Sequence, residues 1–231
     1  TTLMLNIVSS VLSVASCALT GYGFARFKFK GSKFLFWLVI MQIIVPPQIL
    51  LFPQYFNFRY FDIFGIFNAL GGDTLNLIDT PFVMYIPAIF ANGIRAGLFI
   101  LLFRQFFKGL PKELEDAAYL DGCGPFETFV RIMVPNASSS FLTVFIFSIV
   151  WYWNDYYNST IFFNKTRTIS AEIAGMAASF PRLILGQDVP AQSVFVWMQA
   201  GCILAIAPII IMYIFLQKYF TEGVERSGLV G

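Results

Sequence analysis

Long, nearly charge-free runs of apolar residues constrain this chain more than any other feature of its sequence. A hydrocarbon core about 30 Å thick needs about 20 apolar residues of helix to cross it. The composition points the same way, because 58% of the 231 residues are hydrophobic and only 12% are charged. The runs are continuous rather than alternating, so we predict an all-α, polytopic membrane protein. Five spans are predicted, at about 3–24, 34–56, 81–103, 138–153 and 193–216.

Two of these predicted spans contain residues that a lipid-facing helix tolerates poorly. Pro46 and Pro47 remove backbone donors from the second span, and irregular backbone at membrane depth requires protein or water beside it. These prolines either line a gate or only shape the packing. Asn92 and Arg95 fall in the third span, where polar groups usually mark a function. If that span begins nearer Gly97, they lie at its external mouth instead.

The positions of lysine and arginine predict which loops face the cytoplasm, where short loops are enriched in both. The loop after the first span carries four basic residues and no acid, namely Arg26, Lys28, Lys30 and Lys33. The loop after the second span carries Arg59 against three aspartates. We therefore expect a cytoplasmic loop at about 104–135 and an external loop at about 156–191, although three basic residues in the latter weaken the bias.

This orientation places Thr1 on the external side of the membrane. The chain begins without Met, and no basic residue precedes its first span. A removed signal sequence and a missing helix both explain such a start. We expect the second, a sixth span before Thr1.

The residue inventory argues against catalysis by this chain. Histidine, the commonest metal ligand and general base, does not occur in the sequence. The three cysteines are scattered and give no disulfide or metal framework. The phosphate-binding pattern G-x-x-x-x-G-K-[ST] and the pattern G-x-S-x-G are both missing from the sequence. We expect no catalytic, metal or cofactor site here, and no nucleic-acid partner.

The polar segment between the third and fourth spans has the local signals of a helix, a sharp turn and a second helix. Pro111 suits a first helical turn, three nearby acids suit the positive helix start, and Gly122 can close the helix in a left-handed conformation. Two small alanines would let a partner approach the backbone closely. From these residues alone, the segment is either an interfacial hairpin on headgroups or the underside of the bundle, or a docking site.

The spacing of this segment resembles the signature of permease subunits from binding-protein-dependent ABC importers. Asp116-Ala117-Ala118, three residues, Gly122, nine residues and then Ile132-Met133-Val134-Pro135 is similar to E-A-A-x-x-x-G-x9-I-x-L-P. Asp116 replaces Glu and Val134 replaces Leu. Further motifs resembling carbohydrate importer permeases are Gly21 to Phe27, Val45 to Gln48, Pro111 to Glu115, Trp153 to Asp155, Leu216 to Phe220 and Gly228 to Gly231.

The resemblance is strongest to the shorter permease of heterodimeric oligosaccharide systems, such as the smaller membrane subunit of the maltose importer. It implies a single transmembrane domain over residues 1–231 with the type I permease fold, in a family that usually has six spans. It also implies a transport subunit rather than an enzyme. Its partners would be a second permease, two copies of a cytoplasmic ATPase that binds ATP and Mg, and an extracellular solute-binding protein. The location would be a prokaryotic cytoplasmic membrane, and the cargo a carbohydrate, with an oligosaccharide favoured.

The resemblance also implies roles for individual residues. The ATPase would dock on the cytoplasmic helix, and closure of the ATPase dimer would drive alternating access of the spans. The docking residues would be Glu115, Asp116, Ala117, Ala118, Leu120, Asp121, Gly122, Ile132 and Pro135. Candidates for the pathway or its gate are Pro46, Pro47, Asn92, Trp153, Asn154 and Asp155. For the last three we favour an interfacial anchor and gate scaffold over a sugar site.

Three other interpretations stay open from the sequence. The stretch from Glu172 to Ala178 predicts a short external helix that either caps the bundle or approaches the binding protein. An ion-coupled secondary transporter would need acids inside its spans, and the predicted spans contain none. An intramembrane hydrolase is loosely suggested by Gly71-Gly72-Asp73, which is similar to the G-x-G-D of aspartyl intramembrane proteases. That segment lacks the first glycine and lies in a loop.

Overall fold

A computed structural model describes residues 2–62, 71–184 and 191–228 of the chain. Thr1, residues 63–70, 185–190 and 229–231 lie outside the described residues. So do the side chains of residues 177–192 and 218–231. Part of the predicted external loop and most of the ending at Gly228 to Gly231 therefore fall outside the described residues.

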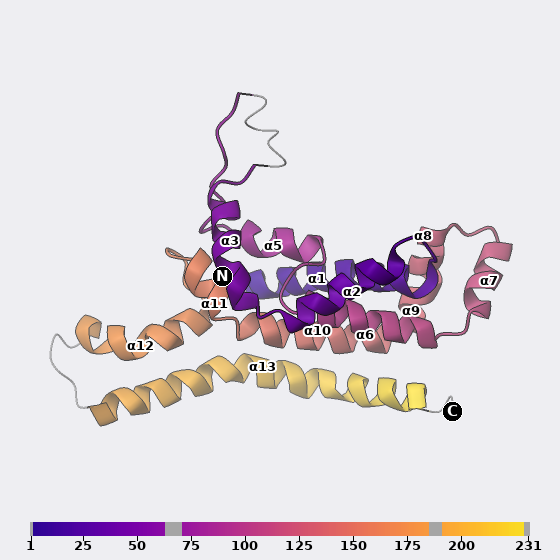
Figure 1. The fold of residues 1–231 in the computed structure, drawn as a ribbon. Coiled ribbons are helices and arrows are strands. Elements are labelled where there is room, and N and C mark those ends of the chain that lie inside the picture. Colours follow the sequence, from indigo (N-terminus) through magenta and orange to yellow (C-terminus); the bar gives the residue numbers. More distant parts are fainter. Residues whose placement is uncertain (1, 63–70, 185–190, 229–231) are drawn as a thin grey trace. The chain divides into compact units, whose positions relative to one another are not determined.

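The described residues form helices joined by short connections, with one antiparallel bridge between Phe61 and Leu75 (Figure 1). The helices before the polar segment are α1 (Thr2–Arg26), α2 (Ser32–Ile44), α3 (Pro47–Arg59), α5 (Phe82–Ile89) and α6 (Ala96–Gly109). The polar segment forms α7 (Glu113–Leu120), α8 (Pro125–Thr128), the π-helical turn η1 (Phe129–Met133) and α9 (Val134–Asn136). The remaining helices are α10 (Ser138–Trp153), α11 (Tyr157–Phe162), α12 (Ile169–Ile184) and α13 (Ala191–Gly228). The all-α class is confirmed for this part of the chain.

Two helices are long and apolar enough to cross a membrane by themselves, α1 and the Ser193–Gln217 part of α13. Two bent pairs also qualify if each counts as one span: α2 with α3, and Pro125–Asn136 with α10. By length and composition, the described residues therefore hold two candidate spans, or up to four. The count of five, with a sixth before Thr1, stays a prediction.

The two prolines of the second predicted span break it as expected. Helix α2 ends at Ile44, and α3 begins at Pro47, whose missing N–H costs nothing in a first helical turn. The third predicted span differs from the prediction, because it consists of two helices rather than one. Ala91 and Arg95 adopt φ values of 52° and 59°, a left-handed conformation that a right-handed helix does not contain. The chain between α5 and α6 is therefore irregular.

The chain divides into two compact units. We call them the first unit (Thr1–Asn6, Pro47–Val83 and Tyr152–Phe215) and the second unit (Ile7–Pro46, Met84–Trp151 and Leu216–Gly231). Each unit has its own packing contacts, and each is described by itself.

The core of the second unit is aromatic and lies where α1, α6 and η1 meet. Phe103 and Phe107 of α6 are fully buried, and the ring of Tyr22 lies 5.5 Å from that of Phe107 and 5.0 Å from that of Phe129. Helix α1 can approach α6 this closely because Gly21 presents no side chain at the crossing. The end of α1 is thereby held directly beside the polar segment.

The first unit packs α11 against α3 around the buried ring of Phe162. That ring makes an edge contact with Phe58 at 5.6 Å and stacks on Tyr55 at 6.5 Å. At the end of α10, the indole N–H of Trp153 donates a hydrogen bond to the carbonyl of Ala205 in α13, at 3.0 Å. These contacts fix the start of the predicted external loop.

Candidate functional site

The short helix α7 is the centre of the site that the sequence predicts. Its first turn carries Glu113, Glu115 and Asp116, whose negative charges suit the positive end of the helix dipole. The sequence places the helix start at Pro111, whereas the helix begins two residues later, at Glu113. Within the second unit, α7 packs against α8 and η1. Helix, turn and returning helix are thus present as predicted.

Helix α7 ends in a compact glycine cap. Gly122 has a φ of 85°, and a Cβ added there would meet no atom within 4 Å. The N–H of Gly122 donates to the carbonyl of Tyr119 at 3.1 Å, and the N–H of Cys123 donates to the carbonyl of Ala118 at 3.0 Å. This pair of bonds is a Schellman motif, which requires a left-handed residue at the glycine position. Glycine is therefore needed for the backbone conformation and not for lack of space.

The predicted docking residues of α7 separate into an exposed and a buried set. Leu120 is 89% exposed, an unusual value for a large apolar side chain. The side chain of Asp116 is 57% exposed and pairs only loosely with Lys112, at 3.9 Å. The exposed set is Asp116, Ala117, Leu120, Asp121 and Gly122. Glu115 and Ala118 are both only 4% exposed and face the protein.

The buried carboxylate of Glu115 is bound by the last turns of α1. The hydroxyl of Tyr22 donates to Oε1 of Glu115 at 2.8 Å, and Nε of Arg26 lies 3.2 Å from Oε2. The Nε–H of Arg26 is not aligned for a hydrogen bond, so this second contact is an ion pair. Arg26 also donates from Nη2 to the carbonyl of Leu110 at 2.7 Å, just before α7. Glu115 therefore does not belong to the exposed face of α7.

The predicted docking residues outside α7 lie on the returning helix. Ile132 is half-buried in η1, and Pro135 is exposed in α9. Their neighbour Met133 is fully buried and joins the aromatic core. The motif that ends at Pro135 is therefore partly a packing element beneath α7.

The first group of gate candidates lies at breaks between helices. Pro46 and Pro47 are exposed at the break between α2 and α3. Asn92 is exposed between α5 and α6, and its Oδ1 accepts a hydrogen bond from Gln42 at 2.9 Å. Arg95 lies over the ring of Trp151, 4.2 Å from its centre. Because α6 begins at Ala96, the structure favours the alternative in which Asn92 and Arg95 precede the helix.

The second group of gate candidates is engaged in holding the backbone. Trp153 is buried and bonded to Ala205, whereas Asn154 is exposed. Asp155 caps α11, because its carboxylate accepts hydrogen bonds from the backbone N–H and hydroxyl of Ser159 and from the side chain of Asn158. Burial raises the pKa of the Asp155 carboxyl, and these hydrogen bonds oppose the rise. Such contacts suit the scaffold interpretation, which stays a prediction.

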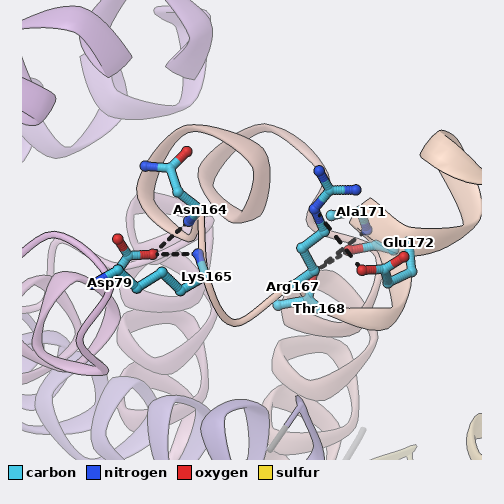
Figure 2. A network of polar contacts seen from close by, with 8 residues as sticks. Asp79, Asn164, Lys165, Arg167, Thr168, Ala171 and Glu172 are labelled. Atoms are coloured by element: carbon cyan, nitrogen blue, oxygen red, sulfur yellow. Dashed lines mark hydrogen bonds and ion pairs between the residues drawn. The ribbon is translucent and has the colours of Figure 1, made fainter. Parts of the chain in front are cut away.

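A network in the predicted external region was not anticipated from the sequence (Figure 2). The carboxylate of Asp79 accepts hydrogen bonds from the backbone N–H groups of Asn164 and Lys165, and its own N–H donates to the carbonyl of Phe162. Asp79 has a φ of 65°, which aspartate tolerates better than most residues. The loop before α5 is thereby tied to the loop after α11.

The neighbouring contacts in the same region cap α12. Thr168 accepts a hydrogen bond from the N–H of Ala171 at 3.5 Å, and Arg167 lies 3.9 Å from Glu172 (Figure 2). The helix predicted at Glu172 to Ala178 is present and longer, because α12 covers Ile169–Ile184, and its external location stays a prediction. Over the residues that the structure describes, no group of three or more His, Cys, Asp or Glu side chains could hold a metal ion.

Tyr22 and Arg26 were missed as site residues. The sequence places Arg26 among the charges that set the topology. The available signal was their spacing of four, which places both side chains on one face of the last turns of α1. A polar pair on one face at the end of an apolar span indicates a buried polar partner.

Comparisons with known proteins agree on the family. The model of the family described as "Binding-protein-dependent transport system inner membrane component" matches residues 18–226. The arabinooligosaccharides transport system permease protein AraQ of Halalkalibacterium halodurans is 30% identical over 227 residues, covering 98% of this chain and 71% of that protein. The lactose transport system permease protein LacG of Rhizobium radiobacter is 25% identical, and the match covers 96% of this chain and 71% of that protein.

A solved structure resembles the chain in fold. A bacterial ABC transporter involved in the import of the acidic polysaccharide alginate contains a chain that matches with a TM-score of 0.67. The match covers 95% of this chain and 72% of that one, at 18% sequence identity. At this identity the likeness concerns the fold alone.

Proposed function

This chain belongs to the family of inner membrane components of binding-protein-dependent transport systems, and from that membership we propose that it is the permease subunit of an ATP-driven carbohydrate importer. The names of its relatives support a carbohydrate cargo, since they refer to arabinooligosaccharides and lactose. We favour an oligosaccharide. The chain would form half of the translocation pathway in a prokaryotic cytoplasmic membrane.

The assembly that we propose contains four kinds of component. A second permease completes the pathway, an extracellular solute-binding protein delivers the sugar, and two copies of a cytoplasmic ATPase supply the free energy. ATP and Mg bind to the ATPase subunits, and this chain binds no cofactor. Its own contribution is the pathway and the docking helix.

The observation that carries the docking proposal is the exposed face of α7. A short helix outside the candidate spans presents Leu120, 89% exposed, between the acids Asp116 and Asp121. An exposed apolar side chain flanked by charges suits a partner with an apolar pocket and a basic rim. Ala117 and Gly122 have small or no side chains, so that a partner could approach the backbone beside Leu120. We retain Ile132 and Pro135 as supports of this face, and Glu115 and Ala118 as its buried side.

The mechanism that we propose is alternating access driven by the ATPase. ATP binding closes the ATPase dimer and thereby favours one arrangement of the spans over the other, because the free energy of binding differs between the two states. A helix docked on the ATPase would carry this difference into the permease. Pro46, Pro47 and Asn92 lie at breaks between helices and are the gate candidates, with Trp153, Asn154 and Asp155 as scaffold.

The first experiment tests the transport class. The chain is co-expressed with its candidate permease and ATPase partners, reconstituted in vesicles, and assayed for uptake of radiolabelled arabinooligosaccharide with binding protein present. Sugar uptake that requires ATP enclosed in the vesicles supports the proposal. Uptake driven by a proton or sodium gradient without ATP would refute it and favour the ion-coupled alternative.

The second experiment tests the docking role with two glycines that lie two residues apart. Gly122→Val places a β-branched residue at a φ of 85° and should distort the end of α7. Gly124→Val is the matched control, because Gly124 has an extended φ of −74° and its added Cβ would meet no atom within 4 Å. We expect at least a fivefold loss of co-purifying ATPase for Gly122→Val only, with the permease pair intact. Equal retention by both variants would contradict docking on α7.

A further inference from the structure

Glu115, Tyr22, Arg26 and the carbonyl of Leu110 meet in one buried polar cluster, which we call the α1–α7 joint. We propose that this joint fixes the docking helix rigidly to α1, so that movement of the ATPase enters the permease through α1. The inference rests on the proposed function. Glu115 and Arg26 are then positioning residues, and neither binds the ATPase.

The burial of the joint separates it from the docking surface. The side chains of Glu115 and Arg26 are 5% and 13% exposed, and Tyr22 is 1% exposed. Asp116, the next residue after Glu115, is 57% exposed. Successive residues of a helix point about 100° apart, so two adjacent acids can serve opposite faces. A partner on the outer face would therefore meet Asp116 and not Glu115.

The contacts of the joint restrain α7 itself and the connection that leads into it. Arg26 reaches both the carboxylate of Glu115 inside α7 and the carbonyl of Leu110 in the connection before it. Tyr22 holds the other carboxylate oxygen, Oε1, at 2.8 Å. One anchor inside the helix and one just before it restrict rotation of α7 as well as its separation from α1, whereas a single contact would leave α7 free to rotate about it.

The ring of Tyr22 is itself immobilised. It lies 5.5 Å from the ring of Phe107 in α6, 5.0 Å from Phe129 in η1, and 5.6 Å from Phe27. Aromatic pairs at such distances attract one another beyond the effect of the area they bury. The hydroxyl that binds Glu115 is consequently held by a packed core, and motion of Glu115 cannot be absorbed locally.

The charges of the joint make it respond sharply to substitution. A buried ion pair is marginal as a source of stability, but removal of one partner leaves an uncompensated buried charge. Glu115→Gln keeps an oxygen for the Tyr22 hydroxyl while removing the charge opposite Arg26. The variant therefore loosens the joint without leaving a cavity.

The test compares Glu115→Gln with Glu113→Gln, an exposed acid of the same helix that lies outside the joint. In the full importer, three quantities are measured: ATPase retained on purification, ATP hydrolysed, and sugar taken up per ATP. We expect Glu115→Gln to retain the ATPase and to hydrolyse ATP, with sugar uptake per ATP lowered at least fivefold. Glu113→Gln should match the wild type in all three. Tyr22→Phe should lower uptake per ATP less, and its effect should not add fully to that of Glu115→Gln.

Amide hydrogen exchange of the same importer complexes provides a readout that does not depend on transport. We expect the amides of α7 to exchange faster in Glu115→Gln than in Glu113→Gln, while those of α10 remain unchanged. Loss of bound ATPase in Glu115→Gln would overturn the inference by making Glu115 a docking residue. Normal uptake per ATP, or unchanged exchange in α7, would overturn it as well. Wild-type vesicles that fail to use ATP would instead overturn the proposed function, and the transmitting role with it.

Discussion

The crossing of α1 and α6 at Gly21 gives the sharpest test of the packing in the second unit. A Cβ added to Gly21 would lie 2.7 Å from Cβ of Phe103, 3.0 Å from the backbone N of Arg104 and 3.1 Å from the carbonyl of Ile100. Two of these three atoms belong to the backbone of α6, and the third is fixed to it. Gly21→Ala therefore cannot be accommodated by rotating a side chain.

The size of the effect follows from ordinary contact distances. Carbon atoms approach to about 3.5–4.0 Å, so the helices must separate by about 1 Å or strain to a similar extent. Overpacking of this kind costs about 1–3 kcal/mol. Replacing glycine by alanine inside a helix returns about 0.5–1 kcal/mol. We expect Gly21→Ala to lower the free energy of unfolding by up to about 2.5 kcal/mol relative to the wild type.

Gly23 supplies the matched control in the same helix. Its added Cβ would meet no atom within 4 Å, so Gly23→Ala should gain the helical preference and nothing else. The difference in unfolding free energy between the two variants isolates the overpacking term, about 1–3 kcal/mol. It is measured on the purified permease by titrating dodecyl sulfate into mild detergent and following tryptophan fluorescence. Equal stability of the two variants, or a more stable Gly21→Ala, would refute the close approach of α1 to α6.

Three further predictions concern other parts of the fold. Gly97→Ala should destabilise the chain relative to Gly109→Ala in the same helix by the overpacking cost of about 1–3 kcal/mol, since its Cβ would lie 2.8 Å from the carbonyl oxygen of Val39 and that of Gly109 would meet no atom within 4 Å. Asp79→Ala should cost about 1–2 kcal/mol through two lost hydrogen bonds and speed proteolysis at the adjoining loops, and Asp79→Asn should lose less. Burial raises the pKa of the Asp155 carboxyl, so the folded protein binds a proton there more tightly than the unfolded chain does. The protonated carboxyl therefore stabilises the fold at low pH, and this contribution is lost as the pH rises through the raised pKa. The stability of the wild type relative to Asp155→Asn should therefore increase from pH 7 to pH 4, and a decrease would contradict the burial of that carboxyl.

The helices that follow from local chemistry were predictable from the sequence. The run at 138–153 has the bounds of α10, and the prolines at 46 and 47 predicted the break after α2, because proline acts on its own backbone. The break between α5 and α6 has no such local signal. Ala91 and Arg95 adopt left-handed conformations that neither residue favours. Tertiary contacts, such as that of Arg95 with Trp151, accompany that break and are invisible in the sequence.

The sequence predicted which segment forms the site, but not which of its side chains are exposed and which are buried. The spacing from Asp116 to Gly122 identified α7 and its glycine cap, since both depend on residues close together in the chain. The adjacent acids Glu115 and Asp116 could not be distinguished, because the choice between them depends on which face of α7 meets α1. That choice is made by Tyr22 and Arg26, about 90 positions away along the chain.

Helix α1 connects the docking helix to the irregular stretch between α5 and α6 inside the second unit. At its end, Tyr22 and Arg26 hold α7. Further back along the helix, the hydroxyl of Ser16 donates to the carbonyl of Ala88 at the end of α5, and Cys17 lies 3.8 Å from the carbonyl of Ala96 at the start of α6. The ten residue-to-residue steps from Ser16 to Arg26 rise about 15 Å along the helix. On the proposed function, a displacement of α7 by the ATPase therefore reaches the backbone on both sides of Asn92 through one continuous helix, and no relay of loops is needed.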